Sequence, residues 1–221
     1  MLEECMQGLA PERGGIYFDG TLGGGGHSYE ILRRSSPEGK LIATDLDDEA
    51  IAAATERLSE FAGRFSIHKS NFKDFEKVLE EEGVDLLDGV MLDFGISSHQ
   101  IDEPERGFSY MCADAPLDMR MDTSAPLTAE DVINDYPQAE LARILKEYGE
   151  ERFASKIAAN VAEARAHSRI KTCGEFVKLI EESIPQKFRQ NGPVARKSFQ
   201  AVRIEVNGEL SGLYEAVLGL T

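Results

Sequence analysis

Short hydrophobic runs alternate with helical patterns over the first half of the chain. Buried strands are predicted at residues 15–19, 40–45, 65–69 and 86–93, and helices at about 27–34, 48–61 and 72–82. Strands separated by single helices are typical of βαβ units, in which the strands run parallel and the helices cover the faces of the sheet. The pattern therefore predicts an α/β fold built on a parallel sheet.

The pattern changes after Asp93. Residues 102–127 are rich in Pro, Asp, Met and Gly and follow no regular period. Helices are then predicted at 128–136, 137–148, 150–166, 172–183, 196–206 and 209–218, the fourth of them opened by a capping box at Thr172. Because only four strands precede these helices, the sheet is expected to be incomplete at its C-terminal end.

These two patterns divide the chain into three parts. Residues 1–101 are expected to form the α/β core, and residues 102–195 an inserted all-helical domain that recognises the substrate. Residues 196–221 are expected to be helices that return to the core. The sequence shows no internal repeat and no low-complexity tract that would suggest another division.

Composition narrows the class of protein. Of 221 residues 42% are hydrophobic, yet no run approaches the ~18 apolar residues that a membrane span needs. The chain begins with Glu3 and Glu4 where a signal peptide would carry Lys or Arg. Cys5, Cys112 and Cys173 are too scattered for a disulfide framework or a zinc site. We therefore expect a cytoplasmic protein that binds neither a membrane nor a metal.

The charge distribution bears on nucleic-acid binding. A net charge of −16 argues against such a partner, because neutralising phosphates calls for a basic surface. Two acid-free basic clusters weaken this objection: Arg165, Arg169 and Lys171 form one, and the stretch from Lys187 to Arg203 forms the other. These clusters are interpreted either as contacts to RNA phosphates or as solvated helix ends.

A glycine-rich turn and a carboxylate indicate a nucleoside cofactor. Residues 20–26 lie between a predicted strand and a predicted helix, and their glycines let the backbone approach a bound nucleotide. The helix start offers free N–H groups to an anionic group. Asp45 ends the next strand, 22 positions after Gly23, where a carboxylate can accept hydrogen bonds from both ribose hydroxyls.

The spacing of the glycines distinguishes between cofactors. The run from Gly23 to Gly26 lacks the dinucleotide GxGxxG spacing, and no P-loop Lys follows it, so a nicotinamide dehydrogenase is a distant alternative. Asp19 stands just before the glycines, where an acid suits a cofactor that carries an amino group and a sulfonium. An Asp before Gly20 is also a common turn former, so this residue has two interpretations.

Six segments carry a resemblance to a known family. They are FDGTLGGGGHS (18–28), LDFGISSHQ (92–100), ERGFS (105–109), PLDMRMD (116–122), YGEERFA (148–154) and SFQAVRIEVN (198–207). Together, and in this order, they closely resemble the bacterial 16S ribosomal RNA (cytosine-N(4))-methyltransferase family over essentially the whole chain. Most of these segments have no generic structural reason to occur together, so the combination is highly specific.

The resemblance implies a Rossmann-like methyltransferase sheet that binds S-adenosylmethionine, with the helical domain inserted after the fourth strand. It implies methylation of the N(4) amino group of a decoding-region cytidine of 16S ribosomal RNA, in the small ribosomal subunit or its assembly precursor. The cofactor-binding residues carried over are Gly25, Gly26, His27, Asp45, Phe72, Asp93 and Gln100.

The sequence also departs from the family pattern. His99 stands where the family usually has Pro, which is expected to loosen the loop that holds Gln100. The chain opens short of the family's usual start and stops at Thr221, before the family's final strands. We therefore expect a sequence truncated at both ends, with a sheet that lacks its last strands.

Methyl transfer to a cytosine amine needs a group that accepts hydrogen from that amine. Asp93, at the end of the fourth predicted strand, is the candidate catalytic residue, while the resemblance gives it a cofactor role. Asp118 and Asp122 are alternatives, or they anchor the loop by pairing with an arginine. Phe108 and Tyr110 either stack on a flipped base or pack beneath their loop.

Two other functions fit parts of this pattern. The acidic charge would suit a methyltransferase for a small molecule or a protein. A truncated product that binds the cofactor without turnover would fit the missing strands. For Phe72 and His27 the alternatives are a core residue and an ordinary residue at a helix start.

Overall fold

The computed structural model describes residues 2–189 and 193–219, and contacts between residues divide them into two compact units. The first unit comprises the residues up to Gly95 together with those from Ser211 onward. The second unit is Ile96–Leu210. Each unit has its own hydrophobic core, as expected for a domain.

The first unit contains a parallel sheet, which confirms the predicted Rossmann-like α/β fold. Its strands are β1 (Ile16–Asp19), β2 (Lys40–Asp45), β3 (Phe65–Lys69) and β4 (Gly89–Met91), in the order β3-β2-β1-β4. The connecting helices are α2 (Gly26–Arg34), α3 (Asp48–Arg57) and α4 (Phe75–Glu82). The chain therefore starts at β1, moves outward to β3, and returns to the other side of β1 with β4.

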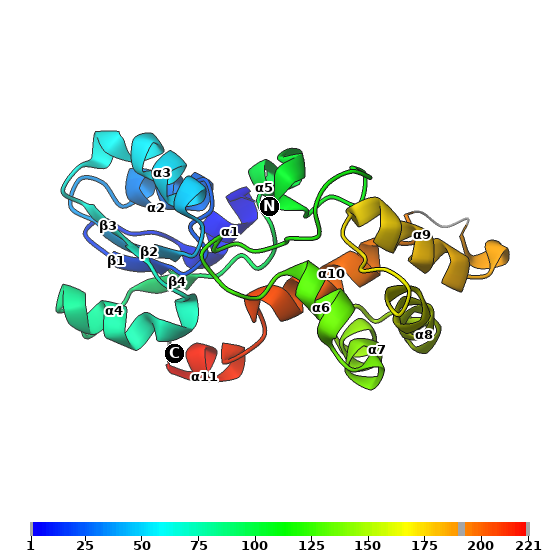
Figure 1. The fold of residues 1–221 in the computed structure, drawn as a ribbon. Helices are drawn as coiled ribbons and strands as arrows, with labels where there is room; N and C mark the ends of the chain where they lie inside the picture. Colours follow the sequence, from blue (N-terminus) through cyan, green and yellow to red (C-terminus); the bar gives the residue numbers. More distant parts are fainter. Residues whose placement is uncertain (1, 190–192, 220–221) are drawn as a thin grey trace. The chain divides into compact units, whose positions relative to one another are not determined.

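Helices cover both faces of this sheet (Figure 1). Successive residues of a strand point to opposite faces, so Tyr17 and Leu41 pack against α1 (Leu2–Leu9), α2 and α3. Phe18 and Ile42 point the other way, into a cluster shared with α4 and α11 (Leu213–Gly219). This two-sided burial explains why the strands read as continuous apolar runs.

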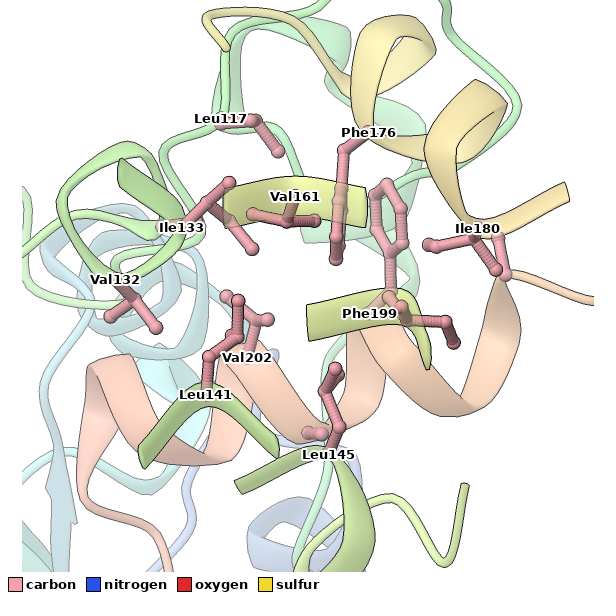
Figure 2. Packing of buried hydrophobic residues seen from close by; sticks show 14 of the residues in the cluster. Leu117, Val132, Ile133, Leu141, Leu145, Val161, Phe176, Ile180, Phe199 and Val202 are labelled. Atoms are coloured by element: carbon pink, nitrogen blue, oxygen red, sulfur yellow. The ribbon is translucent and has the colours of Figure 1, made fainter. Parts of the chain in front are cut away.

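The second unit is helical. Its elements include α5 (Ser98–Asp102), α6 (Ala129–Asp135), α7 (Gln138–Glu147), α8 (Ala154–Arg165), α9 (Cys173–Ser183) and α10 (Arg196–Asn207). Figure 2 shows side chains from α6 to α10 meeting in one core, where Phe176 and Phe199 stack with ring centroids 5.5 Å apart. The predicted capping box at Thr172 is present at the start of α9. Leu117 and Met119 join this core from the aperiodic segment 102–127.

The boundaries of the two units differ from the predicted division. The second unit begins at Ile96, and it includes α10, which packs on α6 and α7 and contributes Phe199 and Val202 to their core. The expectation that all of residues 196–221 return to the sheet is therefore corrected: only α11 belongs to the first unit. Periodicity identifies the apolar face of a helix, but not the surface that buries it.

Three local features were not predicted. The helices α1 and α5 have only eight and five residues, so the apolar face of α1, formed by Leu2, Cys5, Met6 and Leu9, spans too few turns to establish a helical period. The strand β4 is shorter than the predicted run 86–93. Just before it, the carboxylate of Asp88 accepts a hydrogen bond from Ile16 N at 2.7 Å, in place of an apolar contact.

Candidate functional site

Three acidic residues lie at the carboxyl ends of neighbouring strands in the first unit. Asp19 ends β1, Asp45 ends β2, and Asp93 follows β4 after Leu92. Because β2, β1 and β4 are adjacent and parallel, these residues share the edge at which open α/β sheets bind their ligands. This edge, crossed by the glycine-rich segment 20–26, is the candidate site.

Hydrogen bonds fix the glycine-rich segment to both neighbouring strands. Gly20 N donates to Met91 O at 3.0 Å, and Leu22 N donates to Thr44 O at 3.1 Å. The Thr44 hydroxyl donates to Gly20 O at 3.1 Å. A Cβ on Gly20 would lie 2.5 Å from Leu92 Cδ2, so a side chain there would force its neighbours to move.

The turn into α2 is packed on one side and open on the other. Gly25 has φ 73°, a left-handed conformation that favours glycine, and it caps α2 without a side-chain acceptor. A Cβ on Gly25 would approach Ala54 Cβ to 3.1 Å, and Arg57 Nη1 donates to Gly24 O at 2.8 Å. A Cβ on Gly24 would meet nothing within 4 Å. The first N–H groups of α2, such as that of Gly26, can therefore hydrogen-bond to an anionic group.

Asp45 is half-buried, and the chain itself uses only part of its hydrogen-bonding capacity. Its Oδ2 accepts from Gly23 N at 2.7 Å, and its Oδ1 accepts from Asp47 N at 2.9 Å. Burial raises the pKa of this carboxyl above its ordinary value, although these N–H donors oppose the shift. An ionised carboxylate has about four acceptor positions, so this group can accept from a further donor, such as a ribose hydroxyl.

Asp19 is engaged within the protein. Its side chain is 1% exposed and accepts from the Ser28 hydroxyl at 2.6 Å and from Thr21 N at 3.1 Å. Burial raises the pKa of the Asp19 carboxyl, while these two hydrogen bonds act in the opposite direction. The bond to Thr21 N is an Asx turn, so the structure supports the turn-forming interpretation of this residue.

A pH-dependent gain in stability is expected for Asp19→Asn. The folded pKa lies above the unfolded value of 3.8, so the contribution of this carboxyl to the free energy of unfolding decreases as pH rises through the folded pKa. Asn keeps the shape and can bond to Ser28 and Thr21 without a buried charge. We expect Asp19→Asn to raise the free energy of unfolding at pH 7 by on the order of 1 kcal/mol. This gain should vanish at a pH below the unfolded pKa. Denaturant titrations at both pH values measure it, with the exposed Asp85→Asn as control; an equal gain at both would contradict it.

Asp93 and His27 lie close to each other beside the glycine-rich segment. Asp93 N donates to the Thr21 hydroxyl at 2.6 Å, which fixes its backbone to the glycine-rich segment. Its side chain is 51% exposed, and its Oδ2 lies 3.8 Å from Nδ1 of His27, in the first turn of α2. An exposed carboxylate on a fixed backbone can accept hydrogen from a ligand in the site.

Phe72 is a core residue in this structure. It lies in the 3₁₀ turn η2 (Phe72–Asp74), is 7% exposed, and packs with Phe18 beneath the sheet. Its ring meets that of the partly exposed Phe94 edge to face, with centroids 5.2 Å apart. Phe72 thus occupies a core position, as one of its two interpretations expected, and its stacking on a bound adenine stays a prediction.

Gln100 lies in the second unit, where it completes a capping box at the start of α5. Gln100 N donates to the Ser97 hydroxyl at 3.2 Å, and Ser97 N donates to Gln100 Oε1 at 3.0 Å. The Ser-x-x-Gln spacing is a helix-start signal that could have revealed this role in the sequence. Its role as a cofactor contact stays a prediction.

A model of the MraW methylase family matches residues 1–219. The chain belongs to this family. A curated relative from Symbiobacterium thermophilum, named Ribosomal RNA small subunit methyltransferase H, is 49% identical over 99% of this chain and 69% of its own length. A relative of the same name from Geobacter sp. (strain M21) is 51% identical over 99% of this chain and 70% of its own length. This MraW-family chain therefore spans about 70% of the length of these relatives.

In this family member, the aperiodic segment of the second unit carries structural side chains. Asp118 pairs with Arg120 at 2.6 Å, and Asp122 accepts from Ser124. Phe108 is buried in the helical core, and Tyr110 meets Phe199 edge to face. Asp118 therefore anchors the loop, and Phe108 packs beneath it, as the structural interpretations of these residues expected.

The basic cluster at residues 165–171 is largely engaged within the protein. Arg165 donates to Ile133 O and Tyr136 O at the end of α6. Arg169 pairs with the acidic side chains of Glu130, Asp131 and Asp135. Arg165 and Arg169 thus stabilise the helical unit, and the expectation that they face RNA phosphates is corrected. These contacts could not be predicted from residue spacing, because the partners lie 29–39 positions away from the two arginines in the sequence.

Several residues that shape the site were also missed by sequence reasoning. Thr21, Ser28 and Arg57 hold the glycine-rich segment, and only their place near the loop in sequence or on the next helix hinted at it. In the described part of the chain, no helix is both long and apolar enough to cross a membrane. The same residues contain no group of three His, Cys, Asp or Glu side chains arranged to hold a metal ion.

Proposed function

We propose that the chain is an S-adenosylmethionine-dependent methyltransferase that acts on 16S ribosomal RNA in the small ribosomal subunit or its assembly precursor. The observation that carries this proposal is the match to curated relatives named Ribosomal RNA small subunit methyltransferase H, at about half identity over nearly the whole chain. The atom proposed as target, N(4) of a decoding-region cytidine, rests on the resemblance of the six segments. Such a substrate is met in the cytoplasm.

The residues at the edge of the sheet fit the proposed cofactor. A nucleoside ribose needs an acceptor such as Asp45, whose oxygens keep acceptor positions beyond Gly23 N and Asp47 N. A carboxylate group fits the N–H groups of Gly26 and His27 at the open start of α2. The proposed binding set is completed by Gly25, Phe72 and Gln100, and Asp93, to which the resemblance also gives a cofactor role, is proposed to contact the substrate amine instead.

When bound, S-adenosylmethionine supplies an electrophilic methyl group on a sulfonium. The chain has to hold a cytosine amine in line with that methyl group, and such positioning can contribute about 7–11 kcal/mol to lowering the barrier. The amine is a poor nucleophile because its lone pair is delocalised into the ring. Asp93 is proposed to accept a hydrogen bond from the amine and so localise that pair as the new bond forms.

The helical unit Ile96–Leu210 is proposed to recognise the RNA. A base stacked in a duplex cannot present its amine to an enzyme, so the target cytidine has to be single-stranded or flipped out. A scaffold of packed helices offers a rigid surface that can hold such a strand.

Methylation of purified small subunits tests this function. Subunits that lack the modification are incubated with the protein and methyl-labelled S-adenosylmethionine, and the RNA is digested to nucleosides. We expect label in N(4)-methylcytidine at one position of 16S ribosomal RNA. Label in another nucleoside would correct the target atom. Cofactor binding without any labelled RNA would favour a methyltransferase for another substrate, or a chain that binds the cofactor without turnover.

A further inference from the structure

The basic side chains of the second unit differ in what their charged groups contact. Most of its arginines bond to protein groups, as Arg203 does with Glu209 at 2.7 Å and Arg189 with Ile184 O at 2.8 Å. Arg152 and Lys187 differ, because their charged groups contact aromatic rings and form no ion pair or hydrogen bond with any residue that the structure describes. Their N–H donors are therefore available to a ligand.

These two cations and two rings form one exposed cluster. The Arg152 guanidinium lies 4.8 Å from the centroid of the Phe188 ring and 5.7 Å from that of Phe153. Lys187 Nζ lies 5.0 Å from the Phe188 centroid, and the two rings are 5.4 Å apart. Phe188 itself is 36% exposed. We call these four residues the Arg152–Phe188 cluster.

The cluster joins two segments that lie far apart in the sequence. Phe153 caps α8, and its N–H donates to Glu151 Oε1 at 2.9 Å, which fixes the turn that carries Arg152. Phe188 ends the 3₁₀ turn η4 (Gln186–Phe188), where its N–H donates to Pro185 O at 2.8 Å. Local hydrogen bonds thus fix the backbone that carries both rings, which reduces the conformational entropy lost when a ligand binds.

We propose that the Arg152–Phe188 cluster is a binding site for single-stranded RNA. One unpaired base stacks on the Phe188 ring and the Arg152 plane, and Arg152 and Lys187 contact the adjacent phosphates. This combination of exposed aromatic surface and unpaired cations matches the chemistry of a nucleotide, whose base is flat and whose phosphate is anionic. The inference rests on the proposed function for its biological target, and it adds a contact surface that the sheet edge does not provide.

Equilibrium binding of a defined RNA tests the site. The probe is a labelled single-stranded oligocytidine of about 12 nucleotides, within the span of common single-strand sites, titrated at several salt concentrations. We expect Phe188→Leu to weaken binding by about 5- to 150-fold with an unchanged salt slope, because only stacking is lost. Arg152→Met is expected to reduce the slope of log affinity against log salt by about 0.7, the value for one phosphate contact in a single strand.

Two matched control variants distinguish a specific contact from a general effect of the substitution. Phe188→Tyr retains a ring and should bind as the wild type does, and the exposed Lys178→Met removes an equal charge elsewhere on the unit and should leave the slope unchanged. Thermal unfolding of each variant shows whether the fold is intact. Binding by Phe188→Leu within twofold of the wild type, or equal losses for Lys178→Met and Arg152→Met, would overturn the proposed site.

The same samples separate this inference from the proposed function. If the wild type methylates small subunits while Phe188→Leu binds RNA normally, the cluster is not a contact site and the function stands. If Phe188→Leu loses RNA binding while no subunit is methylated, the cluster is an RNA site and the proposed target fails.

Discussion

Replacing Asp93 with Asn should lower single-turnover methylation of small subunits by about 100- to 1000-fold, the range for loss of one group that stabilises a transition state. Asn keeps the shape and one acceptor oxygen but loses the charge that would draw hydrogen from the cytosine amine. Because the Asp93 backbone is held by Thr21, the variant should not displace the glycine-rich segment. Cofactor affinity should therefore change little.

The affinity measurement decides between the two roles of Asp93. If this carboxylate mainly holds the cofactor, affinity should fall and turnover should recover at saturating cofactor, which would contradict the proposed role. Asp85→Asn provides the control, since Asp85 is an exposed acid that precedes β4 at the other end of the strand. It should leave both turnover and affinity unchanged.

Replacing Asp45 with Ala should weaken binding of S-adenosylmethionine by about 10- to 150-fold. The loss corresponds to about 1.5–3 kcal/mol for a hydrogen bond to a charged group. The half-buried position of Asp45 supports the upper part of this range, because nearby water cannot replace the acceptor fully. Isothermal titration calorimetry measures the change, and NAD should show no binding to the wild type.

Two further variants test whether Asp45 acts directly. Asp45→Asn retains an acceptor for Gly23 N and should lose less affinity than Asp45→Ala. Asp48→Ala removes a neighbouring carboxylate that is 66% exposed and pairs with Lys69, and it should bind as the wild type does. Unchanged affinity in Asp45→Ala would remove this residue from the proposed ribose site.

Both predictions concern residues that were identified as candidates from the sequence alone, Asp93 and Asp45. Asp45 and Asp93 end apolar strands, and the right-handed βαβ rule brings the ends of successive parallel strands to one edge of a sheet. The structure places both residues there, beside a glycine-rich loop that was also predicted. Such a site can be predicted from the sequence because local patterns of residues determine where strands end and where tight turns form.

Side chains with two plausible environments were decided by the tertiary structure. Phe72 and Phe108 could have faced a ligand, and both are buried in hydrophobic clusters. Arg169 could have faced RNA, and it pairs with acids on α6. A sequence shows that a residue is aromatic or charged, but not which distant group lies opposite it.

By itself, therefore, the sequence determined the parallel sheet, its crossover helices and the carboxylates at its edge. Each of these depends on the period of apolar residues or on backbone preferences within a few positions. Only the tertiary structure decided that α10 packs with α6 and α7, and that Arg152 meets Phe188 across 36 positions of sequence while Arg165 is engaged by the end of α6. Those outcomes depend on which surfaces compete to bury the same apolar face or satisfy the same charge, and that competition is settled only when the whole unit folds.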